Sequence, residues 1–122
     1  INKKEKFNLY SQIDDVLNEL ERNKLINDQN YTYNKILLFA SQAKSKKFIQ
    51  NYLFQKGIEK KIIQEKLKDF ENNNYDWEKK SAFAFAKKKK LLEKKEKFEK
   101  KLGKMARAGF SYELCKQILK KD

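Results

Sequence analysis

The sequence predicts an all-α fold, built from tandem three-helix repeats that form an elongated, curved array. Three observations support this prediction. The 122 residues include no proline, and strong helix formers fill most of the chain. Apolar residues recur at three- and four-residue spacing, which is typical of one face of a helix. A helix–glycine–helix pattern occurs twice, around Gly57 and Gly109, and repeats of this kind usually build binding surfaces.

The first expected helix covers residues 12–23. Ser11 can cap its N-terminus, and the two aspartates that follow suit the positive first turn. We interpret residues 1–26 as the C-terminal part of a truncated first repeat. Because the chain starts at Ile1 without an initiator methionine, we expect the gene product to extend further at its N-terminus.

Residues 27–74 are predicted to form the second repeat. The Asn27-Asp28 pair offers an N-cap for a helix rich in apolar and aromatic residues. Ser45 can begin the next helix, which Gly57 closes because glycine adopts the left-handed conformation without steric cost. A further helix is expected over residues 59–70, and the three asparagines that follow it mark a loop.

The third repeat, residues 75–122, is expected to begin at a Tyr-Asp-Trp sequence. A dense apolar patch at residues 82–86 runs into four consecutive lysines, and apolar residues then continue a helical stripe up to Gly109. Ser111 can cap the last helix, which extends through Leu119. We expect Phe39, Phe48, Phe70, Phe98 and Phe110 to pack in the core, and we interpret Gly57, Gly109 and Ser111 as structural turn residues.

The charge of the chain makes a polyanion the first partner to consider. Lysine and arginine number 30 against 17 acidic residues, so the formal net charge is +13. Only Arg22 and Arg107 are arginine. Because the arginine fork does most of the reading of guanine edges, we expect any nucleic-acid contact to ignore sequence. An AT-rich coding sequence is an alternative explanation for the lysine surplus.

The sequence offers little support for enzyme chemistry, so we expect no catalytic residues, no cofactor and no metal. The chain has no histidine, which is the side chain best suited to proton transfer near neutral pH. Cys115 is the only cysteine, and its place on an apolar helix face predicts a packed thiol. No segment is apolar enough to cross a membrane, so we expect no membrane contact and a cytoplasmic protein.

Three ordered segments carry a family resemblance. They read Leu-Ile-Asn-Asp at 25–28, Lys-Lys-Phe-Ile-Gln-Asn-Tyr-Leu-Phe-Gln-Lys-Gly-Ile at 46–58, and Arg-Ala-Gly-Phe-Ser at 107–111. Their order and spacing resemble those of the RecX family of bacterial recombinase regulators, over nearly the whole chain. Asn27 and Ser45 stand where that family commonly has an acidic residue and a glycine.

This resemblance implies a specific function. RecX proteins are arrays of three-helix repeats that lie along the groove of the RecA filament. They restrain its ATP hydrolysis, strand exchange and co-protease activities, and thereby modulate DNA repair and the SOS response. The resemblance therefore implies binding to RecA and to single-stranded DNA through nonspecific phosphate contacts. We expect the chain to act as a monomer.

The candidate binding residues are all basic. Some match the family pattern or lie beside residues that do, and others form the densest lysine run. Glutamates at 93, 96 and 99 interleave with the later lysines at helical spacing, so part of this face is expected to be self-paired. Arg107 can contact a partner or cap its own helix, where a cation is favoured. The predicted binding residues are Lys46, Lys47, Lys56, Lys60, Lys61, Lys87, Lys88, Lys89, Lys90 and Arg107.

Two other functions remain open from the sequence. A sequence-nonspecific nucleic-acid-binding helical protein would bind naked DNA or RNA strongly, with no preference for recombinase-coated strands. A helical scaffold with a protein partner would keep its binding in high salt, because its charge would be incidental.

Overall fold

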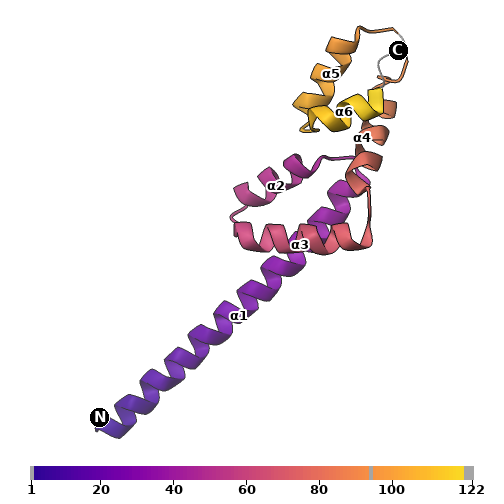
Figure 1. Cartoon of the computed structure of the whole chain (residues 1–122). Helices are drawn as coiled ribbons and strands as arrows, with labels where there is room; N and C mark the ends of the chain where they lie inside the picture. The colour runs from indigo at the N-terminus through magenta and orange to yellow at the C-terminus, as the bar shows by residue number, and fades with distance from the viewer. Residues whose placement is uncertain (1, 94, 120–122) are drawn as a thin grey trace.

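The computed structural model describes residues 2–93 and 95–119, and in these ranges it contains six α-helices and no strand (Figure 1). The all-α prediction is therefore confirmed. Ile1 and residues 120–122, at the outer ends of the first and third expected repeats, lie outside the described residues. The helices are α1 (Lys3–Ser41), α2 (Lys46–Gln55), α3 (Lys60–Asn73), α4 (Trp77–Lys88), α5 (Phe98–Arg107) and α6 (Tyr112–Leu119).

Helix α1 is continuous over 39 residues, so the predicted break between two helices at residues 23–27 is wrong. Ser11 does not cap a helix either, because the N-cap is Asn2, whose Oδ1 accepts a hydrogen bond from the Glu5 amide at 2.8 Å. Asparagine and aspartate cost a helix at most about 0.7 kcal/mol each relative to alanine. With no proline or glycine in this stretch, that cost is too small to stop a helix that is already formed on both sides.

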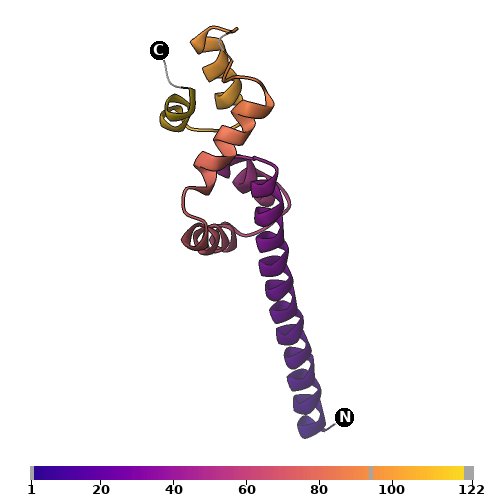
Figure 2. The same cartoon turned by 90° about the vertical axis from the view of Figure 1, so that its right-hand side faces the viewer.

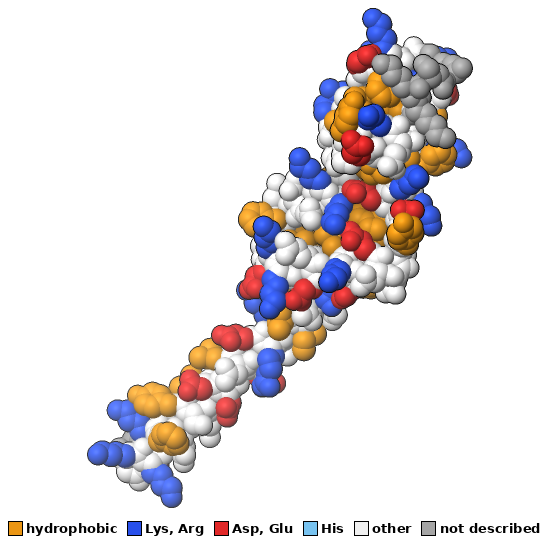
Figure 3. All heavy atoms as spheres, viewed as in Figure 1, with side chains coloured by type: hydrophobic (Ala, Val, Ile, Leu, Met, Phe, Trp, Pro, Cys, Tyr) orange, Lys and Arg blue, Asp and Glu red, His pale blue; other side chains and the backbone are white. Residues whose placement is uncertain are grey.

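The N-terminal part of α1 projects away from the rest of the molecule (Figures 1 and 2). Every side chain from Asn2 to Asn27 is exposed, and the first buried residue of the helix is Thr32. Apolar side chains lie along this projecting part (Figure 3). The exposed apolar residues are Phe7, Leu9, Tyr10, Ile13, Val16, Leu17, Leu20, Leu25 and Ile26.

The end of α1 packs with α2 and α3 around a first hydrophobic core. Trp77, the first residue of α4, closes this core and lies edge-on to Phe70, with 5.4 Å between ring centroids. The buried residues are Ile36, Phe39, Ile49, Leu53, Ile58, Ile62, Ile63, Leu67, Phe70 and Trp77.

Helices α4, α5 and α6 pack around a second core. The predicted apolar patch at residues 82–86 divides between core and surface. Ala82 and Ala86 are fully buried, whereas Phe83 is 49% exposed. The buried residues of this core are Ala82, Ala86, Leu91, Met105, Phe110, Cys115 and Ile118.

The stripe predicted to run unbroken from Leu91 to Gly109 is interrupted, because α4 ends at Lys88 and α5 begins at Phe98. Lys90 adopts a left-handed conformation with φ of 58°, and the Leu91 amide donates to the Ala86 carbonyl at 2.8 Å. This turn returns Leu91 to the core. Consequently Glu93 and Glu96 lie in a connection and do not share a helix with Glu99.

Three of the five expected core phenylalanines, Phe39, Phe70 and Phe110, are buried. Phe48 leaves 37% of its surface exposed, and Phe98 is half-buried. Local spacing could not separate these cases, because the packing of neighbouring elements decides how completely each ring is covered.

Candidate partner and nucleic-acid interface

The start of α2 lies against the turn between α5 and α6. Ser45 is fully buried, and its Oγ donates to the Ala108 carbonyl at 2.9 Å while accepting from the Phe48 amide at 3.1 Å. Gly109, with φ of +98°, faces this serine so closely that a Cβ there would collide with Ser45 Oγ. Two of the segments that resemble RecX, far apart in the sequence, therefore meet in space.

Lys46 is held in place by two carboxylates at this junction. Its ammonium pairs with Glu71 of α3 at 2.8 Å, and its amide donates to Glu78 of α4 at 2.8 Å. This exposed ion pair compensates part of the charge on a residue that the sequence predicts to contact a partner. Lys47, the next residue, is exposed and makes no ion pair within the described part of the chain. Of the two, Lys47 is thus the one available to a polyanion.

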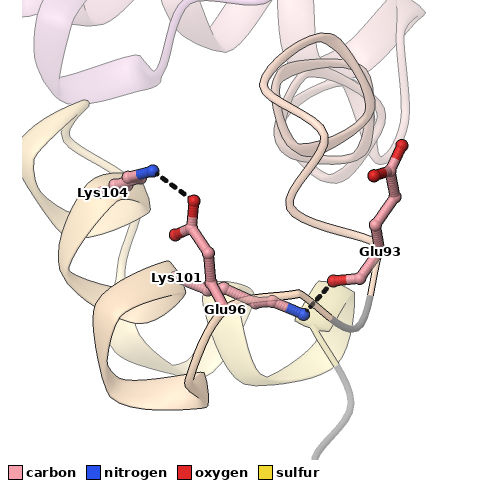
Figure 4. A network of polar contacts seen from close by, with 4 residues as sticks. All are labelled: Glu93, Glu96, Lys101 and Lys104. Atoms are coloured by element: carbon pink, nitrogen blue, oxygen red, sulfur yellow. Dashed lines mark hydrogen bonds and ion pairs between the residues drawn. The ribbon is translucent and has the colours of Figure 1, made fainter.

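A hollow of about 370 Å³ brings together Lys89 from the end of α4 and Arg107 from the end of α5. Phe85 and Lys104 complete its lining. Lys104 is already occupied, since it bonds Glu96 at 2.8 Å (Figure 4). That bond, with the nearby lysine charges, lowers the pKa of Glu96. Lys89 and Arg107 make no ion pair among the described residues, so the hollow is lined by two uncompensated basic side chains and a half-buried aromatic ring.

The other lysines of the run at 87–90 are exposed and lie at the C-terminal end of α4. Lys87 and Lys88 belong to the last turn, where a cation interacts favourably with the helix dipole. Lys101 of α5 donates to the carbonyl of Glu93, which lies in the connection after α4 (Figure 4). The self-pairing expected from interleaved glutamates is thus present around Glu93 and Glu96, but it arises from the folded connection.

Lys56, Lys60 and Lys61 lie around the turn between α2 and α3. Here Gly57 adopts φ of +86°, and the Ile58 amide donates to the Leu53 carbonyl at 3.1 Å. Lys60 lines a groove of about 290 Å³ beside Phe54, which is 68% exposed, and Lys61 faces solvent. Ser111, at the start of α6, accepts from the Leu114 amide at 3.3 Å.

Sequence reasoning missed a second surface, where α1 and α2 bring four aromatic rings and three lysines together. Phe39 is edge-on to Phe48 and to Tyr52, with centroid distances of 5.4 and 4.7 Å. The Phe48 and Tyr52 rings are 6.5 Å apart and inclined by only 20°. We name this surface the aromatic–lysine face; it consists of Tyr31, Lys35, Phe39, Lys44, Phe48, Tyr52 and Lys56.

The lysines of this face lie over its rings. The Lys35 ammonium is 5.7 to 5.9 Å from the centroids of three rings, and Lys44 is 4.9 Å from that of Phe48. A hydrogen bond from Tyr31, with the charges of Lys35 and Lys56, lowers the pKa of Tyr52, and the same bond raises the pKa of Tyr31. The signal in the sequence was four-residue spacing: 31, 35 and 39 on one helix, and 48, 52 and 56 on the next.

Thiol chemistry, metal binding and membrane spanning have little support among the described residues. Cys115 is buried, and desolvation raises the pKa of its thiol, which keeps it protonated at neutral pH. Residues 2–93 and 95–119 contain no cluster of three or more side chains able to hold a metal ion. None of the helices in these ranges combines the length and apolar character of a membrane-spanning segment.

The fold and these surfaces define a class: a small all-helical protein with lysines and exposed aromatic rings on its surface. Comparison with known proteins is more specific. The chain is 35% identical over 112 residues to the regulatory protein RecX of Finegoldia magna, a match that covers 87% of this chain and 54% of that relative. The chain belongs to the RecX family, as its three sequence segments predicted. It spans about half the length of the relative. No family model and no solved structure matches it.

Proposed function

We propose that this protein binds the RecA–single-stranded DNA filament and inhibits its recombinase, ATPase and co-protease activities, thereby modulating DNA repair and the SOS response. The observation that carries the proposal is the similarity to a regulatory protein RecX over 87% of the chain. The chain would act by binding, in the cytoplasm and as a monomer, without chemistry of its own.

The arrangement of the two cores supports the repeat organisation that this function needs. The end of α1 with α2 and α3 forms one three-helix unit, and α4 to α6 form the next. We propose that these units are the repeats at residues 27–74 and 75–122, and that residues 1–26 belong to an earlier repeat. The Ser45–Ala108 hydrogen bond joins the two units, which supports their acting together on a filament.

The charge supports a filament that contains DNA as the partner. A net charge of +13 attracts a polyanion over a long range and speeds docking. Blue lysine and arginine side chains are spread over the body in Figure 3. Of the ten predicted binding residues, Lys46 alone forms an ion pair within the described part of the chain, so we assign the other nine to the contact.

The first test is DNA-dependent ATP hydrolysis by the cognate RecA on single-stranded DNA, titrated with the protein at moderate salt. We expect inhibition at protein levels too low to coat the DNA. Lys47→Glu should raise the concentration needed for half inhibition several-fold, because it places a negative charge where a lysine faces the filament. Lys68→Glu is the matched control, since Lys68 is exposed on α3 and lies outside all the predicted binding residues.

An unchanged ATPase rate, or inhibition only when the DNA is saturated, would count against filament regulation. The second candidate would then take its place: a sequence-nonspecific nucleic-acid-binding protein. The aromatic–lysine face favours this alternative, because stacking rings and lysines are sufficient to bind bare single strands.

A further inference from the structure

We propose that the aromatic–lysine face is a binding site for single-stranded nucleic acid, in which unpaired bases stack on Phe48 and Tyr52 while Lys35, Lys44 and Lys56 contact phosphates. The inference goes beyond the predicted binding residues, which include only Lys56 from this face. It deepens the proposed function by naming the surface that meets the DNA, but it needs no RecA and is tested without it.

The rings are held ready for stacking. Phe48 and Tyr52 lie one turn apart on α2 and are inclined by 20°, so their faces look in nearly the same direction. The buried ring of Phe39, which is 8% exposed, contacts both rings in an edge-on arrangement, with centroid distances of 5.4 and 4.7 Å. A rigid aromatic surface loses little conformational entropy when a base stacks on it.

The rings are also accessible. Phe48 is 37% exposed, and Tyr52 is half-buried. The tip of Lys44 reaches a point 4.9 Å from the Phe48 centroid, and that of Lys56 a point 5.5 Å from the Tyr52 centroid. Lysine side chains are flexible, so a base can reach the exposed parts of the Phe48 and Tyr52 rings once the lysines move to phosphates.

The charges of this face are uncompensated. Lys35, Lys44 and Lys56 make no ion pair among the described residues, whereas Lys46 and Lys104 do. Three ammonium groups beside stacked rings match a strand in which phosphates alternate with aromatic bases. An acidic peptide would satisfy the lysines and leave the rings unused, so the face favours nucleic acid. Because no arginine belongs to the face, we expect it to accept any base sequence.

The test compares two oligonucleotides of equal length and charge, one of deoxythymidine and one abasic, by fluorescence anisotropy with the full chain. Stacking contributes only to the first, so we expect the thymidine strand to bind about tenfold tighter or more. Phe48→Leu should lower this ratio several-fold, because Tyr52 is then the one remaining stacking ring of the pair, and should leave the affinity for the abasic strand nearly unchanged, because leucine keeps the apolar contact with Phe39. Phe48→Tyr keeps the ring and should keep the ratio.

Phe83→Leu is the matched control, because Phe83 is a 49% exposed phenylalanine on α4, outside the face. Circular dichroism melting establishes that each variant is folded. Equal affinity of the original protein for the two strands would overturn the proposal, as would equal effects of the two leucine variants. Polyglutamate and polythymidine can also be compared as competitors at equal concentrations of charge. If the two compete equally well, the proposal is overturned and the face is assigned to an acidic protein.

The two proposals fail separately. If binding depends on the bases but RecA is not inhibited, the proposed site stands and the proposed filament regulation is rejected. If RecA is inhibited but binding does not depend on the bases, the proposed filament regulation stands and the proposed site is rejected.

Discussion

At the scale of single residues, Gly57 and Gly109 illustrate how similar turns differ in their surroundings. Both have positive φ, of +86° and +98°, and both follow a helix of ten residues. A Cβ at Gly57 would meet nothing within 4 Å, whereas one at Gly109 would collide with the buried Ser45 Oγ. The second glycine is therefore required by the contact between the two units as well as by its own backbone.

Alanine substitution should separate these two requirements. Gly57→Ala is expected to cost about 1 kcal/mol from the left-handed backbone alone. Gly109→Ala should cost about 2 to 3 kcal/mol, because it also disturbs the Ser45 hydrogen bonds that cap α2 and reach Ala108. Urea unfolding followed by circular dichroism measures both losses.

Combining Gly109→Ala with Ser45→Ala provides the control. Removing the hydroxyl relieves the collision, so the double variant should lose less stability than the two single losses added together. Equal losses for Gly57→Ala and Gly109→Ala would contradict the close approach.

At the scale of elements, α1 is one continuous helix with two parts, an exposed N-terminal part and a packed C-terminal part. At a rise of about 1.5 Å per residue it is nearly 60 Å long, but its buried residues are Thr32, Ile36 and Phe39, all near the C-terminal end. The projecting part depends on local hydrogen bonds, and a helix without tertiary packing is only marginally stable in water.

Hydrogen exchange should reveal this division. Amides from about residue 7 to residue 27 are expected to exchange through local opening that costs about 0 to 2 kcal/mol, whereas those at 32–40 should approach the protection of the global core. Mass spectrometry of exchanged peptides reports both regions in one experiment. Uniform protection along α1 would show that the projecting part is covered in solution.

At the scale of the whole molecule, charge and fold act together. The net charge of +13 belongs to the complete chain, yet the ion pairs of Lys46 and Lys104 remove two lysines from the set that can meet a partner. Strength of binding to a polyanion depends on the lysines that remain uncompensated on one face, more than on their total number.

Salt dependence counts those lysines. Affinity for bare single-stranded DNA should fall linearly on a log–log plot against salt, because each phosphate contact releases counterions. Replacing Lys44 and Lys56 together by glutamine should reduce the slope by about 1.4, at about 0.7 for each contact with a single strand. Lys68→Gln should leave it unchanged. A slope that does not respond to Lys44 and Lys56 would show that other lysines make the contacts.

Local features were readable from the sequence because they depend on neighbours in the chain. The all-α class, the cap at Ser45, the glycine turn at 57 and the buried Cys115 all follow from residues within one or two helical turns. The continuity of α1 could not be read from local signals, because Ser11 and the Asn27-Asp28 pair resemble N-caps although no proline or glycine interrupts the helix. The RecX family resemblance was recognisable because it rests on three ordered segments.

The sequence by itself therefore determined the helical class, the glycine turns at 57 and 109, the charge and the family of this protein. Only the tertiary structure decided which lysines are uncompensated, since Lys46 meets Glu71 and Glu78 across 25 and 32 residues of chain. It also decided that Ser45 lies against Gly109 and that two helices bring the aromatic–lysine face together. Periodicity along one helix specifies which face is apolar, whereas the partner of each side chain depends on how separate helices pack.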